Sequence, residues 1–570
     1  MAYIKGHDRR QTLLFPECID DYVEQDSPVR LFDAFVDSLD LEALSFQRSK
    51  AADEGRPGYD PRDLLKLYIY GYFYSVRSSR KLARECKCNI EVMWLLGKLT
   101  PDFRTISDFR KENVSQLKSV YKEFNRYCLQ LSLFSKSFIS IDGSKFKAVN
   151  AKDNNFTLNK LDDRIKRLEA HIAVYLAELD EADANESRKL SKEELEDKLK
   201  VAKERKERYE TMRQEMESQN ESQKSVTDPD ARLMKANEGF IVGYNTQTAV
   251  DAESHLLADY ELTQCPTDHG QITTIASRVK EEFGQDTLEA VCDKGYECPE
   301  DQADALAHGV IPNVIRRDCG NETEISYAYN EAEITDEMRA SAQPENLRKC
   351  LEAGVIPDAY KDILTDAQIV EKWTCREELG VTDADVLKMS PEQMLAKAKE
   401  GYFVRDAERN LVYCPQGNIL RQKSLKRNGD IRYCNKLACK HCTCKCTLSP
   451  WKEADFNKDV LIKPAKKKSD NPEDKPKDEP TDKSNKPRSK TKIMTKIVRY
   501  TLHLDEKKMQ QRKCLSEHPF GTLKRTLGHY YFLLKGMLKA DGEMALFCLS
   551  YNMRRAINMV GVPRLIAEMA

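Results

Sequence analysis

The sequence predicts a mixed α/β protein, in which a helical N-terminal region precedes an α/β core that long insertions interrupt. Residues 1–135 carry apolar side chains at helical spacing. From residue 136 the pattern changes to strands that alternate with a helix, which is the arrangement of a mixed α/β core. The 570 residues are enough for several domains of about 100–200 residues each.

Residues 1–135 are expected to form a helical DNA-binding domain. An apolar stripe runs along residues 61–76 (PRDLLKLYIYGYFYSV), and a segment with Arg and Lys at helical spacing follows it. In TPDFRTISDFRKEN, Thr100 is a good N-cap and Pro101 takes the first helical position. This succession of helices resembles a helix-turn-helix unit, although an ordinary helical bundle with solvated basic residues is the alternative. The candidate DNA-binding residues of this region are Arg77, Arg80, Lys81, Arg84, Arg104 and Arg110.

The core is expected to begin at residues 136–157 and to continue over residues 219–315. KSFISIDGSKFKAV (136–149) alternates in polarity, which predicts a hairpin of two strands with Gly143 in the turn. Strand patterns return at 239–251 and 255–264, a helix is expected at 271–283, and short strands are expected at 288–293 and 310–315.

Residues 158–218 predict an inserted helical hairpin. From Leu161 to Leu179, apolar residues follow the 4-3-4-3-4 spacing of a coiled-coil seam. A polar turn and a second helix with its own apolar stripe follow, so the simplest interpretation is an antiparallel pair of helices between two strands of the core.

A second insertion is expected over residues 316–462, of which 316–400 should be helical and polar. Residues 463–492 are rich in Lys, Asp, Pro and Ser and cannot bury apolar area, which predicts a disordered charged linker. Residues 493–570 should be helical again and should end in the apolar helix 542–560.

Two aspartates stand where predicted strands end. Asp142 follows Phe-Ile-Ser-Ile and precedes a glycine, and Asp293 follows Leu-Glu-Ala-Val-Cys and precedes Lys-Gly. A carboxylate at a strand end suits a hard cation such as Mg²⁺, which prefers oxygen ligands and retains waters. Each aspartate alone is typical of a turn, but the pair, with a third acid, indicates a metal site.

The third acid is Glu517, in RKCLSEHPFGTLKRTLG. Lys524 lies seven residues further on, about two helical turns, so both side chains lie on one side of a helix. Pro519 places Glu517 near a helix start or a kink. An acid that completes a metal site, beside a lysine that binds phosphate, is chemically consistent, and a surface acid is the alternative.

Four motifs resemble those of insertion-sequence DDE transposases, namely ISIDGSKFKA, DPDARLMKANEGFIVGYNTQTAVD, VCDKGY and SEHPFGTLKR. They run in the family order across nearly the whole chain, and the N-terminal segment resembles the branch that has a helical N-terminal domain. The resemblance implies a ribonuclease-H-like core in which Asp142, Asp293 and Glu517 are catalytic and bind two Mg²⁺ or Mn²⁺ ions. It also implies binding of the element's terminal inverted repeats and target DNA, strand cleavage and strand transfer.

The resemblance is incomplete just before the glutamate. Related transposases carry Tyr and Arg ahead of the Glu and Lys after it. Lys524 matches, but Gln510 takes the Tyr position and Lys513 the Arg position, with Arg512 adjacent. The difference concerns the phosphate-binding turn and removes no metal ligand.

Six of the 18 cysteines fall between Cys414 and Cys446, which favours metal over disulfides. Cys439 and Cys442 form a CxxC, the usual half of a tetrahedral Zn²⁺ site. The best ligand set is Cys414, Cys439, Cys442 and Cys446, with Cys434 or His441 as substitutes. Free thiols in an insertion are the alternative to this structural zinc knuckle.

Overall composition excludes some classes of protein. No run of about 18 apolar residues is present, and the N-terminus lacks the apolar region of an export signal, so a cytoplasmic, nucleoid-associated bacterial protein is expected. The net charge of −2 gives no general argument for nucleic acid. A homodimer is expected because two DNA ends must be joined. The competing functions are an inactive transposase-derived DNA-binding protein and a coiled-coil interaction protein.

Overall fold

The structure is a computed structural model with mixed α/β architecture, as predicted. It describes residues 18–50, 58–182, 192–219, 221–236, 239–315, 322–340, 346–374, 389–399, 403–425, 431–442, 460–462 and 493–569. The predicted linker, 463–492, lies outside these residues. The chain divides into two compact units, of which the first comprises Met1–Glu322 with Leu504–Ala570 and the second comprises Thr323–His503.

The first unit begins with the predicted helices. Asp102, and not Thr100, caps the fifth of them, because its side chain accepts the backbone N–H groups of Arg104 and Thr105. A short 3₁₀ turn, Ile19–Tyr22, precedes six α-helices: α1 (Pro28–Ser38), α2 (Pro61–Phe73), α3 (Ser79–Cys88), α4 (Ile90–Leu95), α5 (Phe103–Asn113) and α6 (Leu117–Gln130).

The first core strand differs from its prediction. β1 (Ile139–Lys147) is one continuous strand, so the expected hairpin turn at Gly143 is wrong. Gly143 instead pairs with Gln247 in the middle of the ladder to β5 (Gly239–Asp251). The alternation of polar and apolar residues continues through Gly143. Glycine is required at this position because a Cβ atom there would lie 2.3 Å from an Asp268 carboxylate oxygen.

The central sheet has six strands around β1. The remaining members are β4 (Arg232–Ala236), β6 (Leu257–Thr263), β7 (Leu288–Cys292) and β8 (Val310–Val314). β1 pairs antiparallel with β5 and parallel with β7, which in turn pairs parallel with β8. β4 and β6 both pair antiparallel with β5. All four strands predicted between residues 239 and 315 are confirmed, as is the helix α9 (Ile272–Phe283) between β6 and β7.

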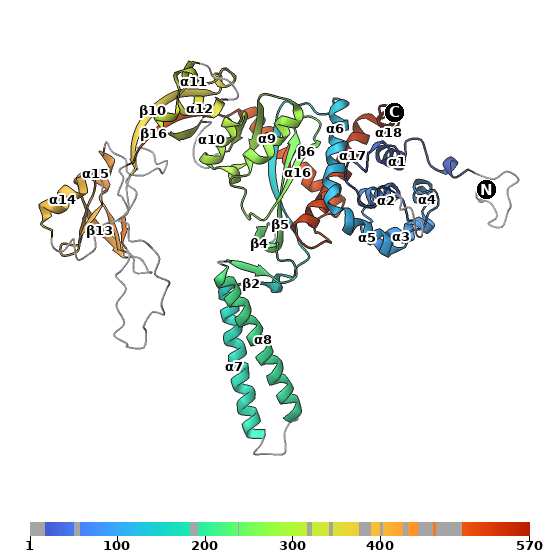
Figure 1. Cartoon of the computed structure of the whole chain (residues 1–570), viewed down its shortest axis with the longest axis horizontal. Helices are drawn as coiled ribbons and strands as arrows, with labels where there is room; N and C mark the ends of the chain where they lie inside the picture. The colour runs from blue at the N-terminus through green and yellow to red at the C-terminus, as the bar shows by residue number, and fades with distance from the viewer. Residues whose placement is uncertain are drawn as a thin grey trace, which may run out of the picture. The chain divides into compact units, whose positions relative to one another are not determined.

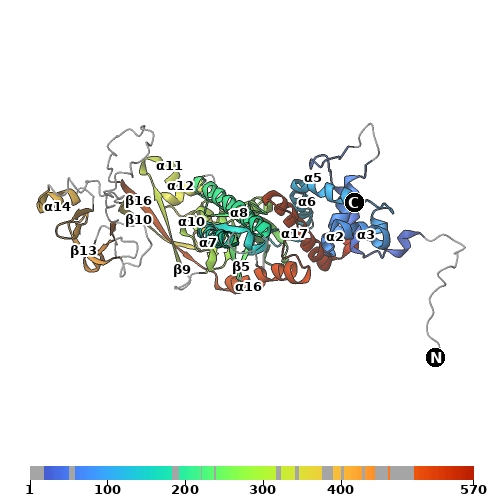
Figure 2. The same cartoon turned by 90° about the horizontal axis from the view of Figure 1, so that it is seen from below.

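Helices complete the first unit (Figure 1). α10 (Pro299–Ala307) connects β7 to β8, and α16 (Glu506–Gly521) continues into a π-helical turn, Thr522–Thr526. The last helices are α17 (Met537–Val560) and α18 (Val562–Ala567). α17 packs against α2, α6 and β6 (Figures 1 and 2). A Cβ atom at Gly542 would lie 2.2 Å from the Val114 carbonyl, so only glycine allows this close approach. One apolar core therefore joins the N-terminal helices to the sheet.

The predicted helical hairpin is present between two short strands. β2 (Asn155–Thr157) leads into α7 (Leu158–Ala182), and α8 (Lys192–Ser218) leads into β3 (Gln223–Ser225), which pairs with β2 (Figure 1). Ion pairs join Arg213 to Asp162 and Lys206 to Glu169, so the helices run antiparallel. Leu161 is fully buried, as the seam predicts.

The second unit contains more strand than the sequence suggested. β9 (Glu322–Tyr329) and β10 (Leu364–Thr374) both pair with β16 (Ile493–His503). The predictions that 316–400 is helical and that helix resumes at 493 are therefore wrong. In β9 every second side chain from Thr323 to Tyr327 is buried, which is the signature of a strand with one face in a core. Short helices accompany these strands: α11 (Asp336–Ala340), α12 (Leu347–Glu352) and α14 (Pro391–Lys399).

A second sheet in this unit carries the cysteines. Five short strands pair in sequence order: β11 (Val404–Asp406), β12 (Leu411–Tyr413), β13 (Ile419–Leu425), β14 (Ile431–Cys434) and β15 (Val460–Ile462). α15 (Lys436–Lys440) follows β14. This sheet has a small apolar core, formed by Phe403, Val412, Leu420 and Tyr433.

Candidate functional site

The register of the sheet places two acids side by side. The parallel ladder between β1 and β7 ends at the pair Ile141 and Cys292. Asp142 and Asp293 are the next residues along the two segments, so both carboxylates stand where β7 ends and β1 continues with β5 as its partner. The sequence pattern, an apolar strand closed by an aspartate, was the signal that predicted this pair.

Each carboxylate is held by one backbone donor and keeps one oxygen free. The N–H of Gly143 donates to Asp142 Oδ1 at 2.9 Å, and the N–H of Gly295 donates to Asp293 Oδ1 at 2.7 Å. Neither Oδ2 atom has a hydrogen bond within the described part of the chain. These two oxygens are available to a ligand.

Burial and like charge disfavour ionisation of Asp142. Its pKa is raised to about 6, first by burial and then by the charge of Asp293, with a smaller contribution from Asp268. The Gly143 N–H and the guanidinium of Arg512 act in the opposite direction and lower this pKa. An acid whose neighbours are mainly other acids is the environment that a divalent cation relieves.

Asp268 is a third acid in this region that the sequence analysis did not single out. Lys145 Nζ donates to both of its carboxylate oxygens, at 3.2 and 3.3 Å, and the side-chain amides of Asn245 and Gln247 donate to Oδ1 at 2.8 Å. Cβ atoms built on Gly143 and Gly295 would approach it. Its position in TDHG, just ahead of α9, is ordinary for a loop residue, so only the fold identifies it.

Glu517 lies on α16 and is exposed. Pro519 lies inside the helix near its C-terminal end, so Glu517 is close to the π-helical turn and far from the helix start. Among the described residues, which include all three predicted acids, no three His, Cys, Asp or Glu side chains are close enough together to hold a metal ion. The structure thus brings Asp142 and Asp293 together without adding Glu517 to one metal-binding group.

The basic residue that α16 presents to the acids is Arg512. Its charge acts on Asp142, and its Nε atom is buried without a hydrogen-bond partner in the described structure. Lys513, which aligns with the Arg of related transposases, is exposed. Arg512, the residue before Lys513, is therefore the one of the two whose charge reaches Asp142.

Lys524 projects from the π-helical turn onto β1. Its Nζ donates to Ser144 Oγ at 2.6 Å and to the Lys145 carbonyl at 2.8 Å, and lies 4.5 Å from the centre of the Phe146 ring. Burial lowers its pKa to about 8, and Lys145 adds to the effect. This partly buried ammonium contacts Ser144, two residues along β1 from Asp142, so it is suited to pair with an anion that enters there.

The predicted DNA-binding residues divide into two groups. Arg80, Lys81, Arg84 and Arg104 are exposed, and Arg80 and Arg104 both stack on Phe103. We call these four residues the basic surface.

Arg77 and Arg110, which were predicted to bind DNA, have partners inside the protein. Arg77 is 8% exposed, donates to the Tyr531 carbonyl at 2.8 Å and lies 3.6 Å from Glu543. Arg110 lies over Tyr68 and donates to the Tyr72 hydroxyl. Helical spacing alone could not separate these two from their exposed neighbours.

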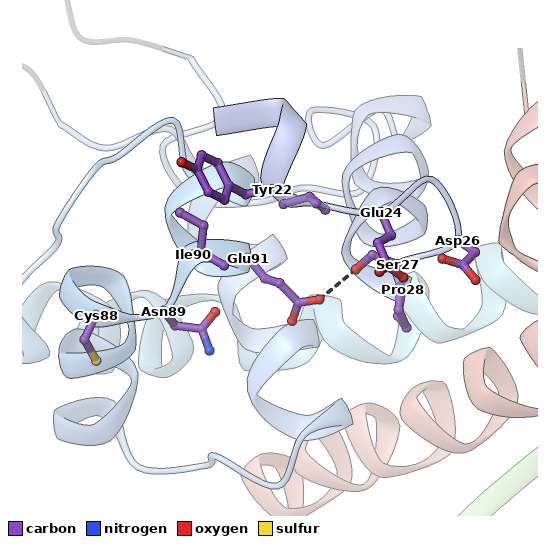
Figure 3. Close-up of a pocket in the computed structure, with 10 residues that line it drawn as sticks. Tyr22, Glu24, Asp26, Ser27, Pro28, Cys88, Asn89, Ile90 and Glu91 are labelled. Atoms are coloured by element: carbon purple, nitrogen blue, oxygen red, sulfur yellow. Dashed lines mark hydrogen bonds between the residues drawn. The ribbon is translucent and has the colours of Figure 1, made fainter. Parts of the chain in front are cut away.

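A cavity of about 700 Å³ in the N-terminal helices has the opposite charge (Figure 3). Three carboxylates line it, those of Glu24, Asp26 and Glu91, and the Ser27 hydroxyl donates to Glu91 at 2.8 Å. These acids repel phosphate, whereas the basic surface attracts it.

The predicted zinc ligands lie at the edge of the five-stranded sheet. Cys414 begins the tight turn between β12 and β13, where its carbonyl accepts the N–H of Gly417. Cys439 lies in α15, and Cys442 follows it. Asn435, the N-cap of α15, donates to the Ile419 carbonyl, which brings α15 next to this turn. Cys446 lies outside the described residues.

Comparison with known proteins gives a match for the N-terminal helices. No helix in the described ranges is long and apolar enough to cross a membrane. No curated protein and no solved structure matches the chain. Residues 17–112, which include the basic surface and none of the three predicted catalytic acids, match the family model described as Transposase domain (DUF772), and this match supports a transposase.

Proposed function

We propose that this chain is a DDE-type transposase that binds the ends of an insertion sequence and catalyses DNA strand cleavage and strand transfer. The observation that carries the proposal is the pair Asp142 and Asp293, two carboxylates placed side by side where β7 ends. The match of the N-terminal helices to a transposase domain agrees with it.

The topology of the sheet supports the catalytic part of the proposal. The strands run in the order β6-β5-β1-β7-β8, with the first three antiparallel and the last three parallel. This is the arrangement expected of a ribonuclease-H-like core, in which acids on the first strand and at the end of the fourth meet. α16 packs on β1 and β7, so it carries Glu517 and Arg512 to the same region.

The donor set fits a divalent cation. Asp142 and Asp293 offer two free carboxylate oxygens, and hard cations such as Mg²⁺ and Mn²⁺ prefer such ligands. Glu517 is the third ligand in this proposal, although it is exposed on α16. The bound metal would lower the pKa of water and stabilise charge on the phosphate oxygens.

The chain's own cations would hold the DNA strand at the acids. Lys524 exchanges its contact with Ser144 for a phosphate oxygen, because the full negative charge pairs better with a buried ammonium than a neutral hydroxyl does. Arg512 neutralises part of the acid cluster and has a free N–H to donate.

The basic surface is proposed to position the duplex. Arg and Lys side chains contact phosphates and set the register of a protein on DNA without reading its sequence. Because two ends must be joined, a homodimer is proposed as the active form.

A structural Zn²⁺ site is proposed for the second unit. Cys414 lies in a turn next to α15, Cys439 lies in α15 and Cys442 follows it. These three side chains do not form a metal-binding group in the structure, so zinc would have to draw them together, with Cys446 to complete the set. Zinc content of the purified chain tests this site directly: one equivalent is expected, and Cys439→Ser should lower it. Zinc-free protein that keeps the same fold would contradict it.

Strand cleavage tests the main proposal. The substrate is the DNA that flanks the gene on both sides, incubated with the full-length chain and either Mg²⁺ or EDTA. We expect cuts only with Mg²⁺. Asp142→Ala should remove cleavage and leave DNA binding intact, because the basic surface is distant in sequence and unchanged. Cleavage that persists in this variant would contradict the assignment.

A second candidate function is DNA binding without cleavage. The observation that favours it is the failure of Glu517 to join the two aspartates in one metal-binding group. Glu517→Gln separates the candidates: an active transposase loses cleavage with this change, whereas a DNA-binding protein shows no cleavage in any form and the same affinity in both.

A further inference from the structure

A cavity of about 380 Å³ lies beside the C-terminal end of β1 and has no role in the chemistry above. Two segments line it: residues 147–149, which follow β1, and residues 530–533, which connect the π-helical turn to α17. Its volume is in the range of pockets that bind small organic groups. Both segments belong to the first unit.

The segment 530–533 is held firmly by backbone hydrogen bonds. Lys147 donates to the Tyr530 carbonyl at 3.1 Å, and Phe532 donates to the Lys147 carbonyl at 2.8 Å. The N–H of Leu533 donates at 2.8 Å to Glu543, a fully buried acid. The segment therefore pairs in parallel with the end of β1, beyond the residues of β1 that pair with β7.

This rigid segment presents a tyrosine ring to solvent. The Tyr530 side chain is 55% exposed and lies 4.9 Å from the Tyr531 ring, which packs under Arg77 at 4.4 Å. A flat apolar ring on a fixed backbone, with a second ring and a cation behind it, is a platform for stacking. Lys147 is exposed at the same cavity and supplies positive charge.

The cavity lies on the strand that carries Asp142. Lys147 lies five positions after Asp142 on β1, which is about 16 Å at about 3.3 Å per residue. That length corresponds to about five stacked nucleotides, and to fewer when the strand is unstacked. A DNA strand with a phosphate at the acids can therefore reach Tyr530.

We infer that Tyr530 and this cavity bind an unpaired nucleobase of the DNA strand that enters the acid pair. The inference rests on the proposed function, because it needs a DNA strand at Asp142. Stacking suits the site because every nucleobase has a flat π-face, whereas Lys147 contacts the backbone. Enzymes that modify nucleobases stack an unpaired base on aromatic side chains in a similar way.

The test uses two DNA probes and the full-length chain in EDTA. One probe is a blunt 30-base-pair duplex, and the other is the same duplex with a five-nucleotide single-stranded 3′ extension that carries 2-aminopurine at each position in turn. Fluorescence reports stacking, and a titration gives affinity. The variants are Tyr530→Ala, Tyr530→Phe and the matched control Tyr22→Ala, whose ring is 52% exposed at the acidic cavity.

The expected result is a preference of the chain for the extended probe of about tenfold or more, with quenching of 2-aminopurine at one position. Tyr530→Phe and Tyr22→Ala should keep both signals. Tyr530→Ala should lose both and still bind the blunt duplex normally, which also shows that it is folded.

Two other results are informative in different ways. If Tyr530→Ala keeps the preference and the quenching, the inference is overturned and the proposed function stands. If the wild-type chain binds neither probe, the proposed function itself fails, and the nucleobase site fails with it.

Discussion

Asp142 on β1 is a partly buried acid and Glu543 on α17 is a fully buried one, and burial is the first cause that raises the pKa of each. Their neighbours differ. Glu543 accepts N–H groups from Leu533 and Leu534 and the hydroxyl of Tyr72, with Arg77 at 3.6 Å. Around Asp142 the charge of Asp293 is the largest neighbouring one and Asp268 adds to it, while the cations Arg512 and Lys524 act in the opposite direction.

This difference separates a structural acid from a functional one. A buried carboxylate surrounded by donors is satisfied by the fold and stabilises it. A buried carboxylate among like charges costs stability, and such a cost persists where the chemistry needs it. Burial and the direction of the pKa shift do not distinguish the two kinds of acid. The groups next to each carboxylate, donors in one case and other acids in the other, do distinguish them.

The largest expected effect on stability comes from removing the structural acid. Glu543→Ala should cost about 3–5 kcal/mol in the free energy of unfolding, because it leaves Arg77 and two buried N–H groups without their partner. Chemical denaturation measures this cost. Glu281→Ala, which removes an exposed acid on α9, is the matched control and should change stability by less than about 0.5 kcal/mol. If both variants lost the same free energy of unfolding, Glu543 would not be a structural acid.

Removal of Asp142, the proposed functional acid, should change stability in the opposite direction. In EDTA at pH 7, Asp142→Asn should stabilise the chain by about 1–3 kcal/mol, because the native state then no longer buries a charge. The folded pKa of about 6 lies above the ordinary value near 3.8. The gain should therefore be full above pH 6 and vanish as the pH falls below about 4. A destabilised variant across this range would mean that Asp142 is structural.

Buried and exposed cations can be compared in the same way as the two acids, and the exposed cations should have the smallest effect on stability. Arg77→Ala should destabilise the chain, whereas replacement of Arg80, Lys81 and Arg84 by Ala should change stability by less than about 0.5 kcal/mol. The triple variant should instead weaken the salt dependence of DNA binding. The slope of log K against log salt should fall by about 0.9 for each phosphate that the protein no longer neutralises. An unchanged slope would remove the basic surface from the DNA interface.

The sequence predicted the acid pair because its signal is local. An apolar run closed by an aspartate occurs twice, and parallel neighbours in one sheet necessarily end at the same edge. The helical hairpin was equally accessible, since the seam from Leu161 repeats over many residues.

The errors occurred where long-range partners decide the structure. Gly143 suggested a turn, but β5, about 100 residues later, supplies the partner strand and Asp268 supplies the crowding. β9 and β16 also meet across a large separation in sequence. Arg77 and Arg80 have the same chemistry and differ only in what α17 and Tyr531 place next to one of them.

Manganese binding by the purified chain tests the central claim most directly. Electron paramagnetic resonance counts Mn²⁺ because the signal of the free ion is lost on binding. We expect the wild type and Glu543→Gln to bind Mn²⁺ alike, and the double variant Asp142→Asn with Asp293→Asn to lose that binding. If the double variant binds as much Mn²⁺ as the wild type, the two aspartates are not a metal site and the proposed catalytic centre is wrong.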